Sequence, residues 1–121
     1  MTLESFLQQL NASPTTVEFN DTMALIDQLY SFTPTAFKNG EVLNRAGENS
    51  GSCKLFAFAQ LQGLSQEQTL ACFGAYYWDD VLKHPERKDH QNIRNFMAHG
   101  WAGIEFEGEV LTANSVKASL G

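Results

Sequence analysis

The stretch "NRAGENSGSCKLFAFAQ", residues Asn44 to Gln60, changes at its middle from small and polar to almost wholly apolar. Its glycines lead into Ser52, which we expect to cap a helix that runs to about Gln62. Apolar residues surround this helix on nearly every side: Leu55, Phe56, Phe58, Ala59 and Leu61. A helix that is apolar all round is buried, so this segment is predicted to be the central helix of the fold.

Four further helices are predicted from capping residues and from apolar residues at helical spacing. One continuous helix is expected from a capping box at Ser65 and Gln68 to Pro85. Phe56, Phe73 and Phe96 each fall on the apolar stripe of a different helix, and we expect them to be buried together. The other three predicted helices begin after Thr2, after Asn20 or Asp21, and after Asp89, and the last of them ends at Gly100.

Three short segments have strand character. Thr15 to Phe19 is β-branched and alternating, although Thr15 and Glu18 also fit a capping box. Asn39-Gly40 lies between apolar residues, which predicts a hairpin. The alternation in "GIEFEGEV" predicts a strand pair that turns near Gly108. Together these elements predict an α+β fold: a helix-dominated single domain over residues 1–121, with about four to five helices and a small antiparallel sheet built from short hairpins. Residues 114–121 are expected to form a frayed tail.

Composition narrows the functional classes. The chain has 121 residues, 43% hydrophobic and 18% charged, and a formal net charge of −6, as expected for an acidic globular protein. Acidity spread over both halves argues against nucleic acid and anionic membranes as partners. No run is long enough to span a membrane, and the N-terminus lacks the features of a secretion signal, so we expect a cytoplasmic protein.

The start of the predicted central helix is a candidate anion-binding site. The free amides of a helix N-terminus attract negative charge, and Asn49, Ser52 and Lys54 lie there. The spacing does not fit a Walker loop. The alternative is that the glycines allow a turn and Ser52 only caps the helix, and this alternative stays open.

A second concentration of polar residues precedes the last helix. Arg94 lies near Asp89 and His90, where a planar guanidinium can bind a carboxylate of the protein or of a ligand. Asp80 and His84 are four residues apart and could share a divalent ion, but residues of this kind more often form a solvated, salt-bridged surface. We therefore assign no metal site and no cofactor to the chain.

A cysteine-dependent reaction is the alternative function. Cys53 is expected in the first turn of the central helix, where the helix dipole would lower its pKa, with His90 or His99 as a base. Against this, a cysteine in an apolar helix is usually a small core residue. Cys53 and Cys72 are taken as free thiols, and we expect Cys53 to be buried and inert.

Three longer strings are specific enough to indicate a family. "FTPTAFKNGEVLNRAGENSGSCKLFAFAQL", "TLACFGAYYWDDVLKHP" and "DHQNIRNFMAHGWAGIEF" together resemble the HopJ type III effector family, in unbroken order from about Val17 to Gly108. Trp78 and the pair Arg87-Lys88 depart from the family pattern. The resemblance implies the fold and, by its name, secretion through a type III system, but no reaction.

The sequence therefore predicts a HopJ-like binding domain. Its expected partner is a small anionic or polar ligand, or another protein. The candidate ligand-binding residues are Asn49, Ser52, Lys54, Asp89, His90 and Arg94. The candidate catalytic residues of the alternative, a hydrolase or transferase, are Cys53, His90 and His99. No enzymatic activity is assigned to the chain.

Overall fold

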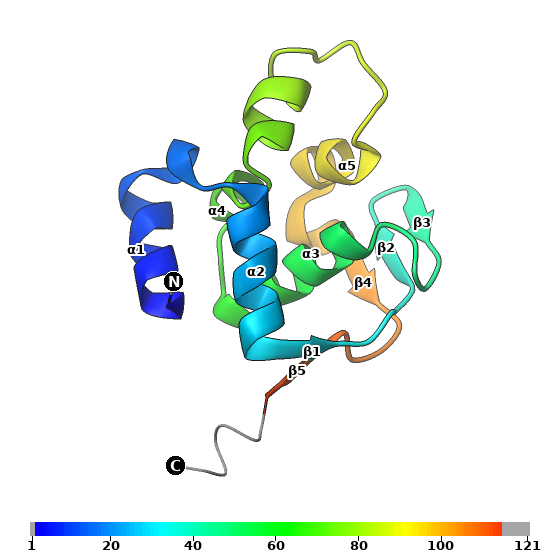
Figure 1. The fold of residues 1–121 in the computed structure, drawn as a ribbon. Coiled ribbons are helices and arrows are strands. Elements are labelled where there is room, and N and C mark those ends of the chain that lie inside the picture. Colours follow the sequence, from blue (N-terminus) through cyan, green and yellow to red (C-terminus); the bar gives the residue numbers. More distant parts are fainter. Residues whose placement is uncertain (1, 115–121) are drawn as a thin grey trace.

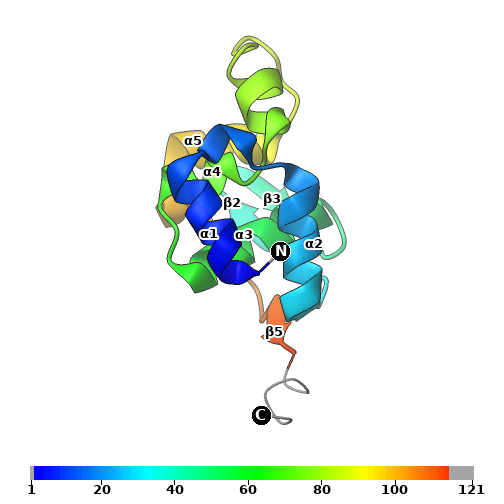
Figure 2. The same ribbon diagram turned by 60° about the vertical axis from the view of Figure 1, so that its left-hand side comes forward.

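The computed structural model describes residues 2–114, which form one α+β domain. Helix α3 runs through the middle, with α2 on one side and a small sheet on the other (Figure 1), and α4 contacts α1, α3 and α5. The turned view shows α1 in front of α4 (Figure 2). The helices are α1 (Leu3–Ala12), η1 (Pro14–Thr16), α2 (Phe19–Leu29), α3 (Ser50–Gln62), α4 (Gln66–Ala71), η2 (Tyr76–Val81), α5 (Gln91–His99) and η3 (Gly100–Gly103). The helix-dominated α+β class is confirmed.

The strands form two small antiparallel sheets, in the orders β3-β2-β4 and β1-β5. Their bounds are β1 (Tyr30–Phe32), β2 (Phe37–Asn39), β3 (Val42–Asn44), β4 (Ile104–Phe106) and β5 (Leu111–Ala113). The hairpin at Asn39-Gly40 is confirmed, and Gly40 takes the positive φ of +60° that such a turn requires. The strand pair expected to turn near Gly108 is wrong, because β4 pairs with β2 and β5 pairs with β1.

The core is aromatic and centres on α3, as predicted. Phe56 is fully buried, and its ring centroid lies 5.5 Å from that of Phe73 and 4.9 Å from that of Phe96. A second cluster on the other side of α3 joins Phe58 to Phe6 at 6.0 Å. The helix is not buried on every side, however, because Leu61 near its end is 57% exposed.

The helix expected from Ser65 to Pro85 is broken. Its capping box is present, but α4 ends after one and a half turns, and the chain resumes as the π-helix η2. At the break, Gly74 has φ +63°, and a Cβ there would lie 2.8 Å from the backbone nitrogen of Phe19. The break therefore lets the chain that enters α2 pass directly against Gly74.

Two local predictions are also corrected. The strand expected at Thr15 to Phe19 does not form. Pro14–Thr16 is instead a 3₁₀ turn, in which the Thr16 Oγ1 donates to the Ser13 carbonyl at 2.6 Å. Phe19 is already the first residue of α2. Helix α2 therefore begins before the predicted caps Asn20 and Asp21.

At the chain end, Asn114 of the predicted tail donates to the Leu29 and Gln28 carbonyls, and residues 115–121 lie outside the described part.

Candidate functional site

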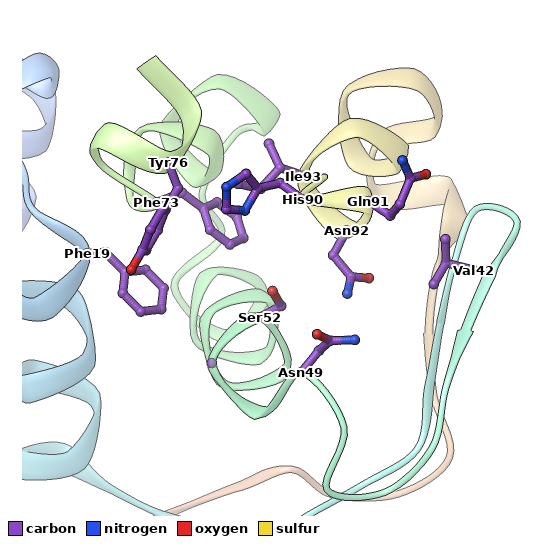
Figure 3. Close-up of a pocket in the computed structure, with 11 residues that line it drawn as sticks. Phe19, Val42, Asn49, Ser52, Phe73, Tyr76, His90, Gln91, Asn92 and Ile93 are labelled. Atoms are coloured by element: carbon purple, nitrogen blue, oxygen red, sulfur yellow. The ribbon is translucent and has the colours of Figure 1, made fainter. Parts of the chain in front are cut away.

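A cavity of about 440 Å³ lies where the N-termini of α3 and α5 meet the start of α2 and the π-helix η2 (Figure 3). The two helix ends contribute polar residues, and the aromatic residues come from α2, from η2 and from the break between α4 and η2. This cavity is the candidate site.

The aromatic wall consists of Phe19, Phe73 and Tyr76. Phe19, the first residue of α2, stacks on Phe73 with centroids 6.2 Å apart and meets Tyr76 edge to face at 5.3 Å. Tyr76 remains 43% exposed at the rim. Gly51 of α3 allows the opposite wall to come close, because a Cβ there would lie 3.0 Å from the Phe19 ring. One side of the cavity can therefore receive a flat apolar group.

The polar wall is formed by the first turns of two helices. Asn49 and His90 occupy the N-cap positions of α3 and α5, and both have a left-handed backbone, with φ of 50° and 51°. Neither helix has a side-chain cap, so its first amides lack a side-chain acceptor, although the Ile93 amide of α5 donates to the His90 carbonyl at 3.0 Å. The caps predicted at Ser52 and Asp89 are wrong: Ser52 lies inside the first turn of α3 and lines the cavity, and Asp89 lies before the N-cap of α5.

Four asparagines hold the two helix ends together. Asn44 and Asn92 exchange amide hydrogen bonds in both directions, at 3.2 and 3.1 Å. Asn49 donates to the Asn44 side-chain oxygen at 2.7 Å, and Asn39 donates to both the side chain and the backbone carbonyl of Asn92. Asn39, Asn44 and Asn92 are buried. This asparagine network links the β2-β3 hairpin to α3 and α5 and so fixes the polar wall.

His90 joins the polar and aromatic walls. Its Nε2 lies 3.1 Å from the Asp80 carboxylate of η2, and its ring lies 5.3 Å from that of Tyr76. Asp80 and His84 are candidate ligands of a divalent ion by their spacing. Within residues 2–114, however, no three His, Cys, Asp or Glu side chains come close enough to hold an ion. Asp80 instead orients the His90 imidazole at the cavity.

Three of the six predicted ligand-binding residues line the cavity: Asn49, Ser52 and His90. Lys54, although only two residues after Ser52, is bound to Asp27 of α2 at 2.9 Å and does not line it. Lys54 and Arg94, both candidate ligand-binding residues, therefore do not meet in this cavity.

Arg94 is engaged within the protein instead. It binds the Asp89 carboxylate at 2.7 Å and donates to the backbone carbonyls of His84 and Asp89. The hydrogen bond from Arg94 lowers the pKa of Asp89. These contacts brace the loop that leads into α5, and neither Asp89 nor Arg94 lines the cavity.

Cys53 lies where it was predicted, but its thiol does not have the lowered pKa that a nucleophile needs. It lies in the first turn of α3 and is 2% exposed, and its Sγ lies 3.6 Å from the Thr35 carbonyl oxygen. Burial raises its pKa to about 11, so the predicted dipole-lowered pKa is wrong, whereas the expectation that it is buried is confirmed. Burial likewise raises the pKa of Cys72 to about 12.

His99, the other proposed base, lies at the far end of α5 against Gly40 and Gly103. It is absent from the cavity lining, and no histidine nitrogen of the described chain bonds to the Cys53 thiol. The cysteine-dependent reaction therefore lacks both a thiolate and a positioned base.

The model of the HopJ type III effector protein family matches residues 3–111. The chain belongs to the HopJ family. The crystal structure of the unknown-function protein VPA0580 superposes on this HopJ domain with a TM-score of 0.92 and 58% sequence identity, over 94% of this chain and 95% of that one. No relative with curated function is detected. Within residues 2–114 of the HopJ domain, no helix is long and apolar enough to cross a membrane.

Sequence reasoning missed the aromatic wall, the asparagine network and Asp80 as the partner of His90. Phe19, Phe73 and Tyr76 have the spacing of ordinary core residues, so nothing in the sequence separates them from the core. The asparagines left no clear signal either. Asn44 is followed by Arg45, and Asn92 follows Gln91, so nothing in the sequence marks these two amides as buried.

Proposed function

We propose that this HopJ domain is a binding protein for a small organic ligand, which it holds in the cavity between α3, α5 and η2. The observation that carries the proposal is the division of the cavity into an aromatic and a polar wall (Figure 3). Pockets that bind small molecules combine apolar surface, which supplies affinity, with a few fixed polar groups, which supply orientation.

The rigidity of both walls supports this reading. Phe73 is buried in the core, and Phe19 stacks on it, so the aromatic wall is fixed before a ligand arrives. Asn44 and Asn92 fix the helix ends on the other side. A preformed site loses little conformational freedom on binding, which favours binding of small ligands.

A blocked-cavity variant tests the proposal. Fragments that contain an aromatic ring and a polar group are screened by the amide NMR spectrum, in which we expect binders to shift the signals of Gly51, Ser52 and Gln91. Ser52→Phe fills the cavity and should abolish these shifts. Gln60→Phe adds the same ring to an exposed position on the same helix and should not change them.

Two results would contradict the proposal. One is a screen in which no fragment shifts the cavity amides. The other is binding that survives in Ser52→Phe, which would place the ligand elsewhere on the domain. The melting temperatures of both variants show whether the fold is retained.

A further inference from the structure

We propose that two copies of this domain pair through strand β3, so that their small sheets join into one continuous antiparallel sheet. The inference is independent of the proposed ligand binding and starts from the free edge of the sheet β3-β2-β4. Each copy presents the same strand to the other, and the two copies are related by a two-fold axis that passes next to Leu43.

The hydrogen bonds between β2 and β4 establish which way the β2 backbone faces. The Gly40 amide, just after β2, donates to the Gly103 carbonyl at 2.9 Å. The Glu107 amide donates to the carbonyl of Ala36, just before β2, at 3.0 Å. Along an antiparallel strand, the backbone groups of successive residues point to opposite sides. The even-numbered residues of this segment therefore face β4, and the odd-numbered ones face β3.

The same alternation leaves the backbone of Leu43 unpaired. The odd-numbered residues of β2 lie opposite Val42 and Asn44. Leu43 lies between these two, so its N–H and C=O point away from β2 toward the free edge. Within residues 2–114, neither group has a hydrogen-bond partner. A strand edge with a free donor and a free acceptor is a template on which a further strand can pair.

The side chains favour pairing at β3 over pairing at the opposite edge. Leu43 is 77% exposed, the highest value among the exposed large hydrophobic residues of the described chain. Strand β3 also lacks the proline and lysine with which edge strands commonly avoid pairing. Strand β4 has an exposed glutamate, Glu105, at its middle. Two copies of β4 paired about this residue would set like charges against each other, which is unfavourable.

The charges that flank Leu43 identify a second copy as the partner. Glu41 precedes Leu43 by two residues and Arg45 follows it by two, so the three side chains share the outer face of the strand. Both charged residues are exposed, and neither forms an ion pair within residues 2–114. In an antiparallel pair centred on Leu43, Glu41 of each copy lies opposite the partner's Arg45. Opposite charges at such positions stabilise a sheet, whereas a parallel pair would set Glu41 against the partner's Glu41.

The contact is short, so the dimer is expected to be weak. The Glu41 amide already donates to the Asn95 side chain at 3.3 Å. The Arg45 amide donates to the Glu48 carboxylate at 2.8 Å. The new backbone bonds are therefore the two that the Leu43 residues exchange, from the N–H of each copy to the C=O of the other. Because small interfaces bind weakly, we expect a dissociation constant of roughly 0.1 mM.

Charge reversal at both flanking positions tests the pairing. Sedimentation equilibrium measures the dimer of the wild type at concentrations around this dissociation constant. Glu41→Arg and Arg45→Glu each set like charges against one another at two places in the dimer, and each should weaken it roughly tenfold or more. An equimolar mixture of the two variants has opposite charges at both places, so it should form a heterodimer about as tight as the wild-type dimer. The variant that carries both changes should dimerise for the same reason.

Matched controls separate this pairing from effects of net charge. Glu86→Arg and Lys88→Glu make the same changes of charge on the exposed loop before α5 and should leave the dimer unchanged. Leu43→Pro removes the outward amide and the exposed side chain. No bond inside the domain uses that amide, so this variant should fold and stay monomeric. Melting temperatures show which variants retain the fold, and the charge reversals test the pairing if Leu43→Pro does not.

Four results would overturn the inference. The first is a wild type that stays monomeric at millimolar concentration. The second is a dimer that persists in both single charge reversals, which would place the interface on another surface. The third is a mixture of folded Glu41→Arg and Arg45→Glu that forms no heterodimer, since the antiparallel register requires one. The fourth is an NMR shift of the Leu43 amide by an unrelated extended peptide without self-association, which would make β3 a docking edge for a different strand.

Discussion

Replacement of Asn44 by alanine removes the centre of the asparagine network. Four hydrogen bonds disappear, two with Asn92, one with Asn49 and one to the Phe37 carbonyl. Asn49 is exposed and can bind water, but the Asn92 amide nitrogen remains buried without its partner. At about 1 kcal/mol for a typical bond, and more for a buried group left unsatisfied, the variant should lose about 3 kcal/mol of unfolding free energy.

A double-mutant cycle separates the network from simple loss of packing. Asn92→Ala alone removes three side-chain bonds and should cost about 2–3 kcal/mol. Once Asn44 is gone, removing Asn92 costs less, because its amide is already partly unpaired. The double variant should therefore be less destabilised than the sum of the single variants, by about 1–2 kcal/mol.

Urea denaturation followed by circular dichroism measures all four proteins. For a domain of this size, the loss in Asn44→Ala corresponds to a fall in melting temperature of about 10 °C. Additivity to within about 0.5 kcal/mol would refute the reasoning, because independent sites add and members of one network do not. A cost below about 1 kcal/mol for Asn44→Ala would show that water replaces the network.

Three further results are expected. Phe56→Ala should lose about 3–5 kcal/mol of unfolding free energy in the same assay, since it leaves a large cavity at the centre of the core; a melting curve like that of the wild type would contradict the central position of α3. Gly74→Ala should destabilise by more than about 1 kcal/mol, because its Cβ would meet backbone at 2.8 Å and its φ is positive, and an unchanged stability would show that the break can relax. Cys53 should resist a brief iodoacetamide pulse near pH 7 in the native protein and react after unfolding, as burial and a pKa of about 11 require; rapid native labelling, read by mass spectrometry, would revive the nucleophile hypothesis.

The fold was predictable where its signals are local. The hairpin at Asn39-Gly40, the capping box at Ser65 and the apolar run of α3 each depend on residues a few positions apart, and all three are present. The break at Gly74 was missed because its cause is a backbone that passes close to it from α2, more than fifty residues away in the chain.

The site was predictable in part for the same reason. Asn49, Ser52 and His90 were identified because helix starts have recognisable sequences. Lys54 was assigned to the site on its charge, but the sequence does not reveal that Asp27 lies within reach. A charged side chain near a predicted site contributes to that site only if no protein partner takes it first, and that depends on tertiary structure.

The pairing of the strands has a consequence for how the chain reaches its native state. Strand β1 pairs with β5, so Tyr30 lies opposite Ala113, and β2 pairs with β4, which is likewise far away in the chain. Contacts between residues so far apart in sequence are slow to form, since a long loop must close before any of them contributes. On a ribosome, both sheets stay incomplete until β4 and β5 have been synthesised. The helices around α3 are therefore expected to pack together first, and β4 and β5 are expected to pair after this core has collapsed.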